Sequence, residues 1–214
     1  MIVDLSHPIE NGMTYFPGDP EPRVGPATAE PPWRVSDLHL GTHTGTHIDA
    51  ATHFIPGGTA IDAYPLERFI LSGVVVPLPG LGGNEAIPWR SIAPRLEGLP
   101  PGRAVVLNTG WERYWGHDRY LEHPYLAGAA ARELVNAGVG LVATDALNLD
   151  STPRGASLVH EILLGADVLI VENLRGLGQL ERDRAYRFSF LPLRLKGLDG
   201  SPVRAVAWPE GPAR

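Results

Sequence analysis

Four short apolar runs in the middle of the chain constrain its fold more than any other feature. They are GVVVPLP (73–79), AVVLNTG (104–110), GLVATD (140–145) and DVLIVENL (167–174). Each run is rich in β-branched residues and has turn-forming residues beside it, a pattern typical of a buried β-strand. We therefore expect four buried strands.

Two segments between these runs favour helices. YLAGAAARELVNAG (125–138) precedes the third run, and its alanines suit a helix that ends at Gly138. GASLVHEILLGAD (155–167) precedes the fourth run and suits a second short helix that stops at Gly165. The order strand, helix, strand, helix, strand predicts an α/β fold.

The end of the chain has the pattern of an antiparallel pair. The segments 186–195 and 201–208 flank Asp199 and Gly200, and Asp-Gly is a strong turn signal for a hairpin. We therefore expect a C-terminal β-hairpin and a mixed sheet. A length of 214 residues with 43% hydrophobic residues suits a single domain over 1–214.

Charge and cysteine content exclude several function classes. Eighteen basic and 24 acidic side chains give a net charge of −6, which argues against nucleic acid or an anionic membrane as partner. The absence of cysteine excludes disulfides, zinc-thiolate sites and cysteine nucleophiles. No apolar run approaches the length of a membrane span, and MIVDLSHPIE lacks the features of a signal peptide, so we expect a cytoplasmic protein.

The segment GTHTGTHIDAATHF (41–54) concentrates the donors His43, His47, Asp49 and His53. A helix would place only the first two on one face. A straight strand would separate His43 from His47 by roughly 13 Å, whereas two ligands of one metal, each bonded at about 2.0–2.2 Å, need donor atoms roughly 3–3.5 Å apart. We therefore expect the segment to bend at its glycines, so that the imidazoles converge.

The donor atoms are nitrogen and oxygen, which suits zinc, manganese, iron or cobalt. Three ligands with room for water would make a catalytic site rather than a closed structural one. His160, in the second predicted helix, and Glu172, at the end of the fourth run, are candidates to join it. Each alone has an ordinary structural explanation, but together they would permit two metals.

HTGTHIDAATHF (43–54) resembles the metal-binding signature of the kynurenine formamidase family, also called the cyclase family of metal-dependent hydrolases. The similarity continues in DLSHPIENGMTYFPGDP (4–20), VHEILLGADVLIVENL (159–174) and GLDGSPVRAVA (197–207). The resemblance implies a swivelling β/β/α domain that assembles as a homodimer or homotetramer.

The resemblance also implies a ligand set. His43, His47 and Asp49 would bind a first divalent metal. Asp49 and Glu172 would bridge to a second ion, completed by His160. The metal would be Zn²⁺, as one or two ions, with Mn²⁺ as an alternative.

Two further roles follow from the resemblance. His53 would be the catalytic acid/base rather than a ligand, and Phe16 would pack against the substrate. Kynurenine formamidases have a tryptophan where this chain has Phe16.

The implied function is hydrolysis of the C–N bond of a small-molecule amide by an arylformamidase-like enzyme, with N-formylkynurenine or a related formamide as substrate. The alternatives are a cyclic-amide hydrolase of the isatin type, a cyclase or dehydratase on the same scaffold, and a non-catalytic metal-binding module. A binding module would not need His53. The aromatic stretch 111–125 suggests a lid or a subunit contact.

Overall fold

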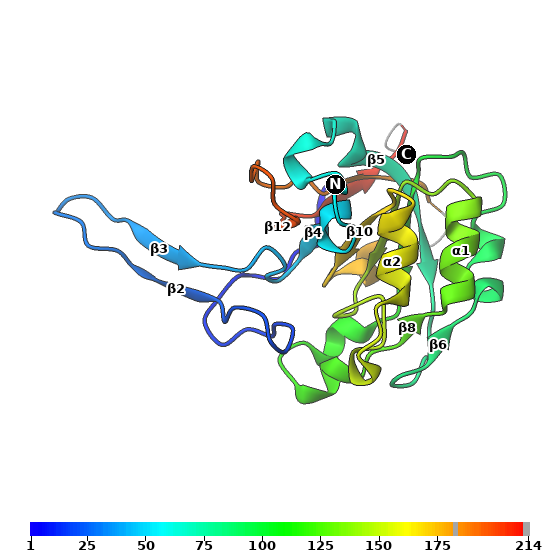
Figure 1. The fold of residues 1–214 in the computed structure, drawn as a ribbon, viewed down its shortest axis with the longest axis horizontal. Helices are drawn as coiled ribbons and strands as arrows, with labels where there is room; N and C mark the ends of the chain where they lie inside the picture. Colours follow the sequence, from blue (N-terminus) through cyan, green and yellow to red (C-terminus); the bar gives the residue numbers. More distant parts are fainter. Residues whose placement is uncertain (182–183, 212–214) are drawn as a thin grey trace.

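A nine-stranded mixed sheet forms the centre of the described part of the chain, residues 1–181 and 184–211 of a computed structural model (Figure 1). Its strand order is β1-β13-β11-β5-β7-β9-β10-β4-β12. In chain order these strands are β1 (Val3–Asp4), β4 (His47–Asp49), β5 (Ile70–Pro77), β7 (Ala104–Asn108), β9 (Leu141–Thr144), β10 (Leu169–Glu172), β11 (Tyr186–Ser189), β12 (Gly200–Pro202) and β13 (Val206–Pro209).

The four apolar runs form β5, β7, β9 and β10, which are neighbours and run parallel. Successive side chains point to opposite faces, so Val75 joins one core cluster and Val76 the other. Every residue of β9 and β10 is buried. Strands covered on both faces are continuous apolar runs, which is why these four were readable in the sequence, and their prediction is confirmed.

Helices α1 (Gly128–Asn136) and α2 (Leu158–Gly165) lie side by side over one face of the sheet (Figure 1). Leu134 and Leu163 belong to the core cluster on this face. Gly138 has a φ of +71° and follows α1 as predicted, because a left-handed residue allows the Val139 N–H to donate to the Leu134 carbonyl. Both predicted helices are confirmed, although each is shorter than its segment.

Short 3₁₀ helices lie in the connections. They are η1 (Ala51–His53), η2 (Ile61–Ala63), η3 (Leu66–Arg68), η4 (Trp89–Ser91), η5 (Ala93–Arg95), η6 (Trp111–Tyr114), η7 (Asp118–Glu122), η8 (Thr152–Arg154) and η9 (Leu177–Gln179). Strands β6 (Ala86–Ile87) and β8 (Tyr125–Leu126) form a small parallel pair. No helix within the two described ranges is both long and apolar enough to cross a membrane.

The end of the chain corrects one detail of the prediction. Strands β11 and β13 do pair antiparallel, which confirms the mixed sheet. However, Asp199 and Gly200 do not form a tight turn between them, because Gly200 opens β12, which pairs with β4 at the other end of the strand order. A Cβ at Gly200 would lie 2.7 Å from the Ile48 carbonyl oxygen. Glycine is therefore required here by close strand packing.

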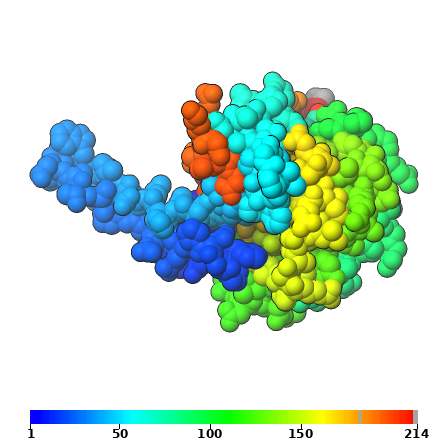
Figure 2. All heavy atoms as spheres, in the orientation of Figure 1, coloured from blue at the N-terminus to red at the C-terminus, as the bar shows by residue number. Residues whose placement is uncertain are grey.

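A two-stranded arm leaves the body of the molecule. It consists of β2 (Arg23–Pro26) and β3 (Ser36–His39), which pair antiparallel and project away from the sheet (Figures 1 and 2). The side chains of the arm include Trp33, which is 70% exposed, and Leu38, which is 59% exposed. The arm contributes no residue to the core clusters of the described chain.

The aromatic stretch 111–125 is divided: Trp111 and Tyr120 pack inward and cannot form an exposed lid or subunit contact, whereas Tyr114 and Trp115 are only partly buried. Trp111 and Tyr120 are fully buried. The Trp111 indole N–H donates to the Tyr120 carbonyl at 3.2 Å, and the Tyr120 hydroxyl donates to the Asp145 carbonyl at 3.0 Å. Phe16 packs against this cluster from outside. Burial of these polar groups is possible because each has a partner inside the protein.

Candidate metal centre

The donor-rich segment bends around a short strand, as its glycines predicted. Strand β4 puts His47 and Asp49 two residues apart and so on the same face. His43 precedes the strand, before a reversal at Gly45, whose φ is +64°. His53 follows in η1. All four side chains reach one cavity.

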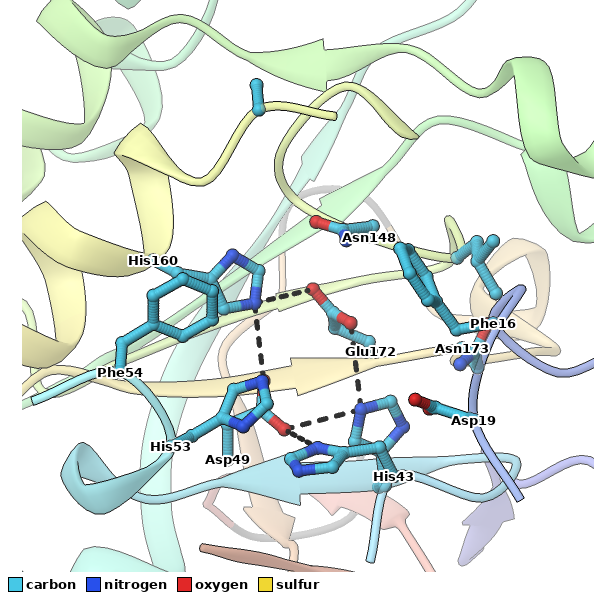
Figure 3. A pocket seen from close by; sticks show the side chains of 13 residues that line it. Phe16, Asp19, His43, Asp49, His53, Phe54, Asn148, His160, Glu172 and Asn173 are labelled. Carbon is cyan, nitrogen blue, oxygen red and sulfur yellow. Dashed lines mark hydrogen bonds and ion pairs between the residues drawn. The ribbon is translucent and has the colours of Figure 1, made fainter. Parts of the chain in front are cut away.

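Strand β10 and helix α2 bring the two distant candidates to the same place. Glu172 ends β10 opposite His47 of β4. Its Oε2 lies 3.6 Å from His47 Nε2, and its Oε1 lies 3.5 Å from His160 Nε2. The same His160 nitrogen lies 3.6 Å from Asp49 Oδ2 (Figure 3). These separations are too long for hydrogen bonds and leave space between the donors.

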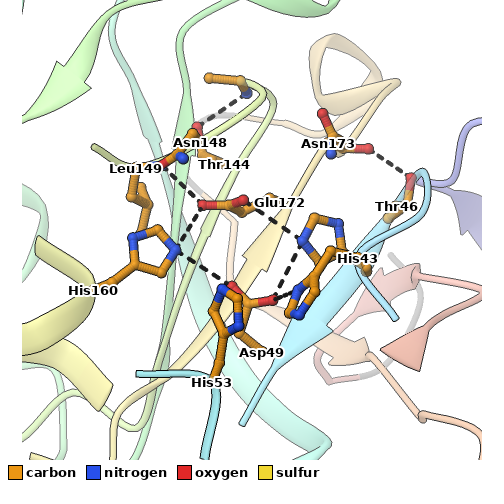
Figure 4. Close-up of polar contacts among 12 residues, drawn as sticks. His43, Thr46, Asp49, His53, Thr144, Asn148, Leu149, His160, Glu172 and Asn173 are labelled. Carbon is orange, nitrogen blue, oxygen red and sulfur yellow. Dashed lines mark hydrogen bonds and ion pairs between the residues drawn. The ribbon is translucent and has the colours of Figure 1, made fainter. Parts of the chain in front are cut away.

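Among the described residues, three groups of donors each have ligand atoms within 4.8 Å of one another, and two of these groups share the Asp49 carboxylate (Figure 4). The first is His43, His47 and Asp49, and the second is Asp49, His160 and Glu172. The third is His43, His53 and Asp199. The structure therefore brings together all five residues that the resemblance named as ligands.

Two imidazoles are held so that one nitrogen faces the cluster. His47 donates from Nδ1 to the Gly45 carbonyl at 2.8 Å, and His160 donates from Nδ1 to Asp150 Oδ2 at 2.8 Å. In both rings Nε2 is left for a cation. A hydrogen bond on the outer nitrogen is the usual way in which proteins orient metal-binding histidines.

The charges of the cluster fit a cation. Asp49 Oδ2 is buried and has no hydrogen-bond partner among the described residues, which is costly for a carboxylate oxygen. Burial lowers the pKa of His160, but its hydrogen bond to Asp150 and the nearby Asp49 and Glu172 carboxylates outweigh burial and raise this pKa to about 10. Burial also lowers the pKa of His43, but Asp49 and Asp199 raise it to about 10. These carboxylates favour positive charge here, and a divalent cation would supply it.

His53 lies beside the two groups that share Asp49, in the third group with His43 and Asp199. Its Nδ1 lies 3.3 Å from Asp199 Oδ2, and His43 Nε2 lies 2.9 Å from the same oxygen. Burial lowers the pKa of His53, and the charges of the neighbouring groups partly oppose one another. Its side chain is 28% exposed, compared with 4% for His47 and His160. His53 therefore lies where solvent or substrate can reach it.

A cavity of about 280 Å³ opens above the donors (Figure 3). Phe16 lies in its wall, where the sequence placed a substrate contact. Its remaining lining residues were not foreseen as site residues, and they are Asp19, Phe54, Leu147, Asn148, Ala156 and Asn173.

The family of the chain follows from a match over residues 3–151. A family model described as "Putative cyclase" matches residues 3–151 of the chain. The chain belongs to this family. The cyclase-family resemblance expected from the sequence is thus confirmed.

Several known proteins resemble the chain over nearly its whole length. A kynurenine formamidase from Paracidovorax citrulli is 34% identical over 214 residues, 96% of this chain and 95% of the formamidase. A solved structure described as a potential metal-dependent hydrolase with cyclase activity has a TM-score of 0.83 at 28% identity, and the match covers 99% of both chains. Isatin hydrolase A from Labrenzia aggregata shares the fold, with a TM-score of 0.84 at 24% identity over 97% of this chain and 93% of that one.

Two carboxylates that support the cyclase-family site were missed by the sequence reasoning. Asp150 is buried and accepts N–H hydrogen bonds from Val159 and His160 at the start of α2, so it holds the helix as well as the imidazole. Asp199 was interpreted only as a turn residue. Asp150 lies between the third apolar run and the second predicted helix, outside every segment in which the sequence indicated a site residue.

Proposed function

We propose that the chain is a metal-dependent hydrolase that cleaves the C–N bond of a small-molecule aryl amide, with N-formylkynurenine or a related aryl formamide as the first candidate. One observation carries the proposal: two donor groups sharing Asp49 lie below a cavity with an aromatic wall. The 34% identity to a kynurenine formamidase supports the choice of reaction.

The metal would be held by the two groups as the resemblance implies. His43, His47 and Asp49 would hold one ion, and Asp49, His160 and Glu172 would hold a second. When bound, a divalent cation supplies Lewis acidity toward water and toward an amide carbonyl. The nitrogen and oxygen donors suit Zn²⁺, with Mn²⁺ as the alternative.

His53 would move the proton. With Nδ1 beside Asp199, Nε2 is the ring nitrogen with no hydrogen bond among the described residues. Because burial lowers its pKa, the imidazole is neutral at neutral pH and accepts a proton from the attacking water at Nε2. The same atom then donates that proton to the leaving nitrogen as the C–N bond breaks.

The remaining walls would orient the substrate. Phe16 offers an apolar face to an aromatic ring, and it is supported from behind by the buried Trp111 and Tyr120 cluster. Asn148 and Asn173 line the cavity near Glu172 (Figure 3). The Asn173 amide is buried and bonded to Tyr120 and to the Gly45 carbonyl, so Asn148 is the amide that would hydrogen-bond a polar atom of a ligand. The cavity thus combines an aromatic wall with polar groups that can fix the orientation of a small molecule.

The proposal is tested with protein loaded with Zn²⁺ or Mn²⁺ and assayed on N-formylkynurenine, formanilide, isatin and a hydantoin. We expect the formamides to be hydrolysed with the highest kcat/KM. Faster opening of isatin would reassign the chain to cyclic amides. Stoichiometric metal with no turnover of any of the four would overturn the hydrolase assignment in favour of a binding module.

A further inference from the structure

Asp19 enters the cavity from a tight turn at the base of the arm. The Asp19 N–H donates to the Phe16 carbonyl at 3.0 Å, and Gly18 between them has a φ of +105°, which favours glycine. This turn directs both the Phe16 ring and the Asp19 carboxylate into the cavity (Figure 3). An aromatic face and a carboxylate therefore share one wall.

The Asp19 carboxylate has no bonding partner among the described residues. It makes no hydrogen bond or ion pair with any residue in the described ranges, and it belongs to neither donor group that shares Asp49. By contrast, Glu172 accepts the Leu149 N–H at 2.9 Å and faces two imidazoles. Asp19 is half-buried, so a ligand in the cavity can reach it.

Within the described part of the chain, the cavity holds no long cationic side chain that could neutralise Asp19. Among the described residues that line the cavity there is no lysine and no arginine. The positive charge of the cavity is therefore confined to the donor cluster, and a substituent placed beside the Phe16 ring meets the negative charge of Asp19. A primary ammonium there would form a charge-assisted hydrogen bond, whereas a carboxylate there would be repelled.

We infer that Asp19 is a specificity-determining residue that selects aryl amides with an ammonium-bearing side chain on the ring. The inference rests on the proposed function and refines its substrate class. The aryl ring lies against Phe16, and the ammonium donates to the Asp19 carboxylate. No reacting atom touches Asp19, so its contribution appears as a preference between substrates.

The test uses three formanilides that differ only in the ortho side chain: aminoethyl, propyl and carboxymethyl. In the metal-loaded wild type we expect kcat/KM to favour aminoethyl over propyl by about 10- to 100-fold, the value of a hydrogen bond between charged groups. Asp19→Asn should remove this preference to within about twofold, raise activity on the carboxymethyl compound and leave the propyl compound unchanged. Metal content should not change.

Asp37→Asn is the matched control, because Asp37 is an exposed carboxylate on β3 of the arm. This variant changes net charge equally and should keep the wild-type preference. A preference that survives Asp19→Asn, or that Asp37→Asn removes equally, would overturn the inference.

A binding measurement separates this inference from the proposed function. The corresponding anilines, which lack the formyl group, are titrated into the metal-loaded protein by calorimetry. If no formamide is hydrolysed, the proposed function fails, yet tighter binding of the aminoethyl aniline that depends on Asp19 would still support the charge selection. Equal binding of all three anilines to wild type and Asp19→Asn would reject it.

Discussion

His53 is set apart from the other histidines of the centre by its surroundings. It shares the Asp199 carboxylate with His43, but it faces the cavity and keeps more exposure than His47 or His160. A ligand gains from deep burial among carboxylates, whereas a proton carrier must meet the substrate. The difference in burial is therefore the physical basis for giving these residues different roles.

Replacing His53 by asparagine is expected to leave the metal in place and to lower kcat by roughly 10²–10⁴-fold, the usual contribution of a positioned acid/base. His47→Ala is the matched comparison and should lose most of the metal, because it removes a ligand from the first donor group. Metal content measured by mass spectrometry and turnover measured on the same samples decide between the roles. Equal metal loss in both variants would make His53 a ligand, and full activity of His53→Asn would leave it a structural residue.

The acid limb of the pH profile is expected below pH 6.5. Burial lowers the pKa of His53 from its ordinary value of 6.5, so the neutral base persists further into acid than a free imidazole would. Activity is present above this pKa and is lost as pH falls through it, since protonation removes the acceptor. The limb should be seen in kcat/KM of the wild type and should be absent from the residual activity of His53→Asn. An acid limb of unchanged position in the variant would assign the titration to another group.

At the level of elements, the centre depends on how helix α2 meets the loop before it. Asp150 accepts the Val159 and His160 N–H groups at the helix start and also holds His160 Nδ1. One buried carboxylate thus fixes both the helix and the direction of its ligand. This double use explains why an imidazole on an apolar helix points toward the sheet edge.

Asp150→Ala is expected to weaken the second metal by about 10- to 100-fold, as loss of a hydrogen bond behind a metal ligand usually does. The first metal should be unaffected, because His43 and His47 make no contact with Asp150. Titration against a competing chelator would resolve the two affinities. Thr152→Ala, in the neighbouring η8, serves as control, and an equal loss of affinity there would indicate general loosening of the loop instead.

The same elements show what the sequence predicts and what it does not. The four parallel strands were readable because burial on both faces leaves a local apolar pattern. The pairing of β12 could not be predicted in this way. Asp-Gly has a local turn preference, whereas the pairing of Gly200 with Asp49 is set by a distant strand. The convergence of His160 with β4 likewise arises from sheet order, which residue spacing cannot encode.

At the scale of the whole molecule, the arm exposes apolar side chains that do not pack against the body. Trp33 and Leu38 are 70% and 59% exposed on a hairpin that extends away from the sheet (Figure 2). The body carries an apolar groove in which Leu66 and Leu193 are 65% and 59% exposed. An apolar projection and an apolar groove on one chain suit association of two copies, each arm covering the other body.

We therefore predict a homodimer or homotetramer that depends on the arm. Sedimentation velocity at micromolar concentration should show an assembly larger than the 23.1 kDa chain. The double change Trp33→Ser and Leu38→Ser should shift it toward monomer, because it removes the two largest exposed apolar side chains of the arm. Ile2→Ser changes an exposed apolar residue next to strand β1 of the sheet and should leave the assembly unchanged.

Activity is expected to fall with dissociation, because the turn that carries Phe16 and Asp19 into the cavity lies at the base of the arm. Anchoring the arm on a second body would hold this wall in place, and freeing the arm would raise KM more than it lowers kcat, since the metal donors lie on the sheet. Steady-state kinetics of the Trp33→Ser/Leu38→Ser variant at concentrations where it is monomeric measures this directly. A wild-type or variant monomer with full kcat/KM would show that one chain completes the site alone, and the arm would then have no part in holding the substrate wall.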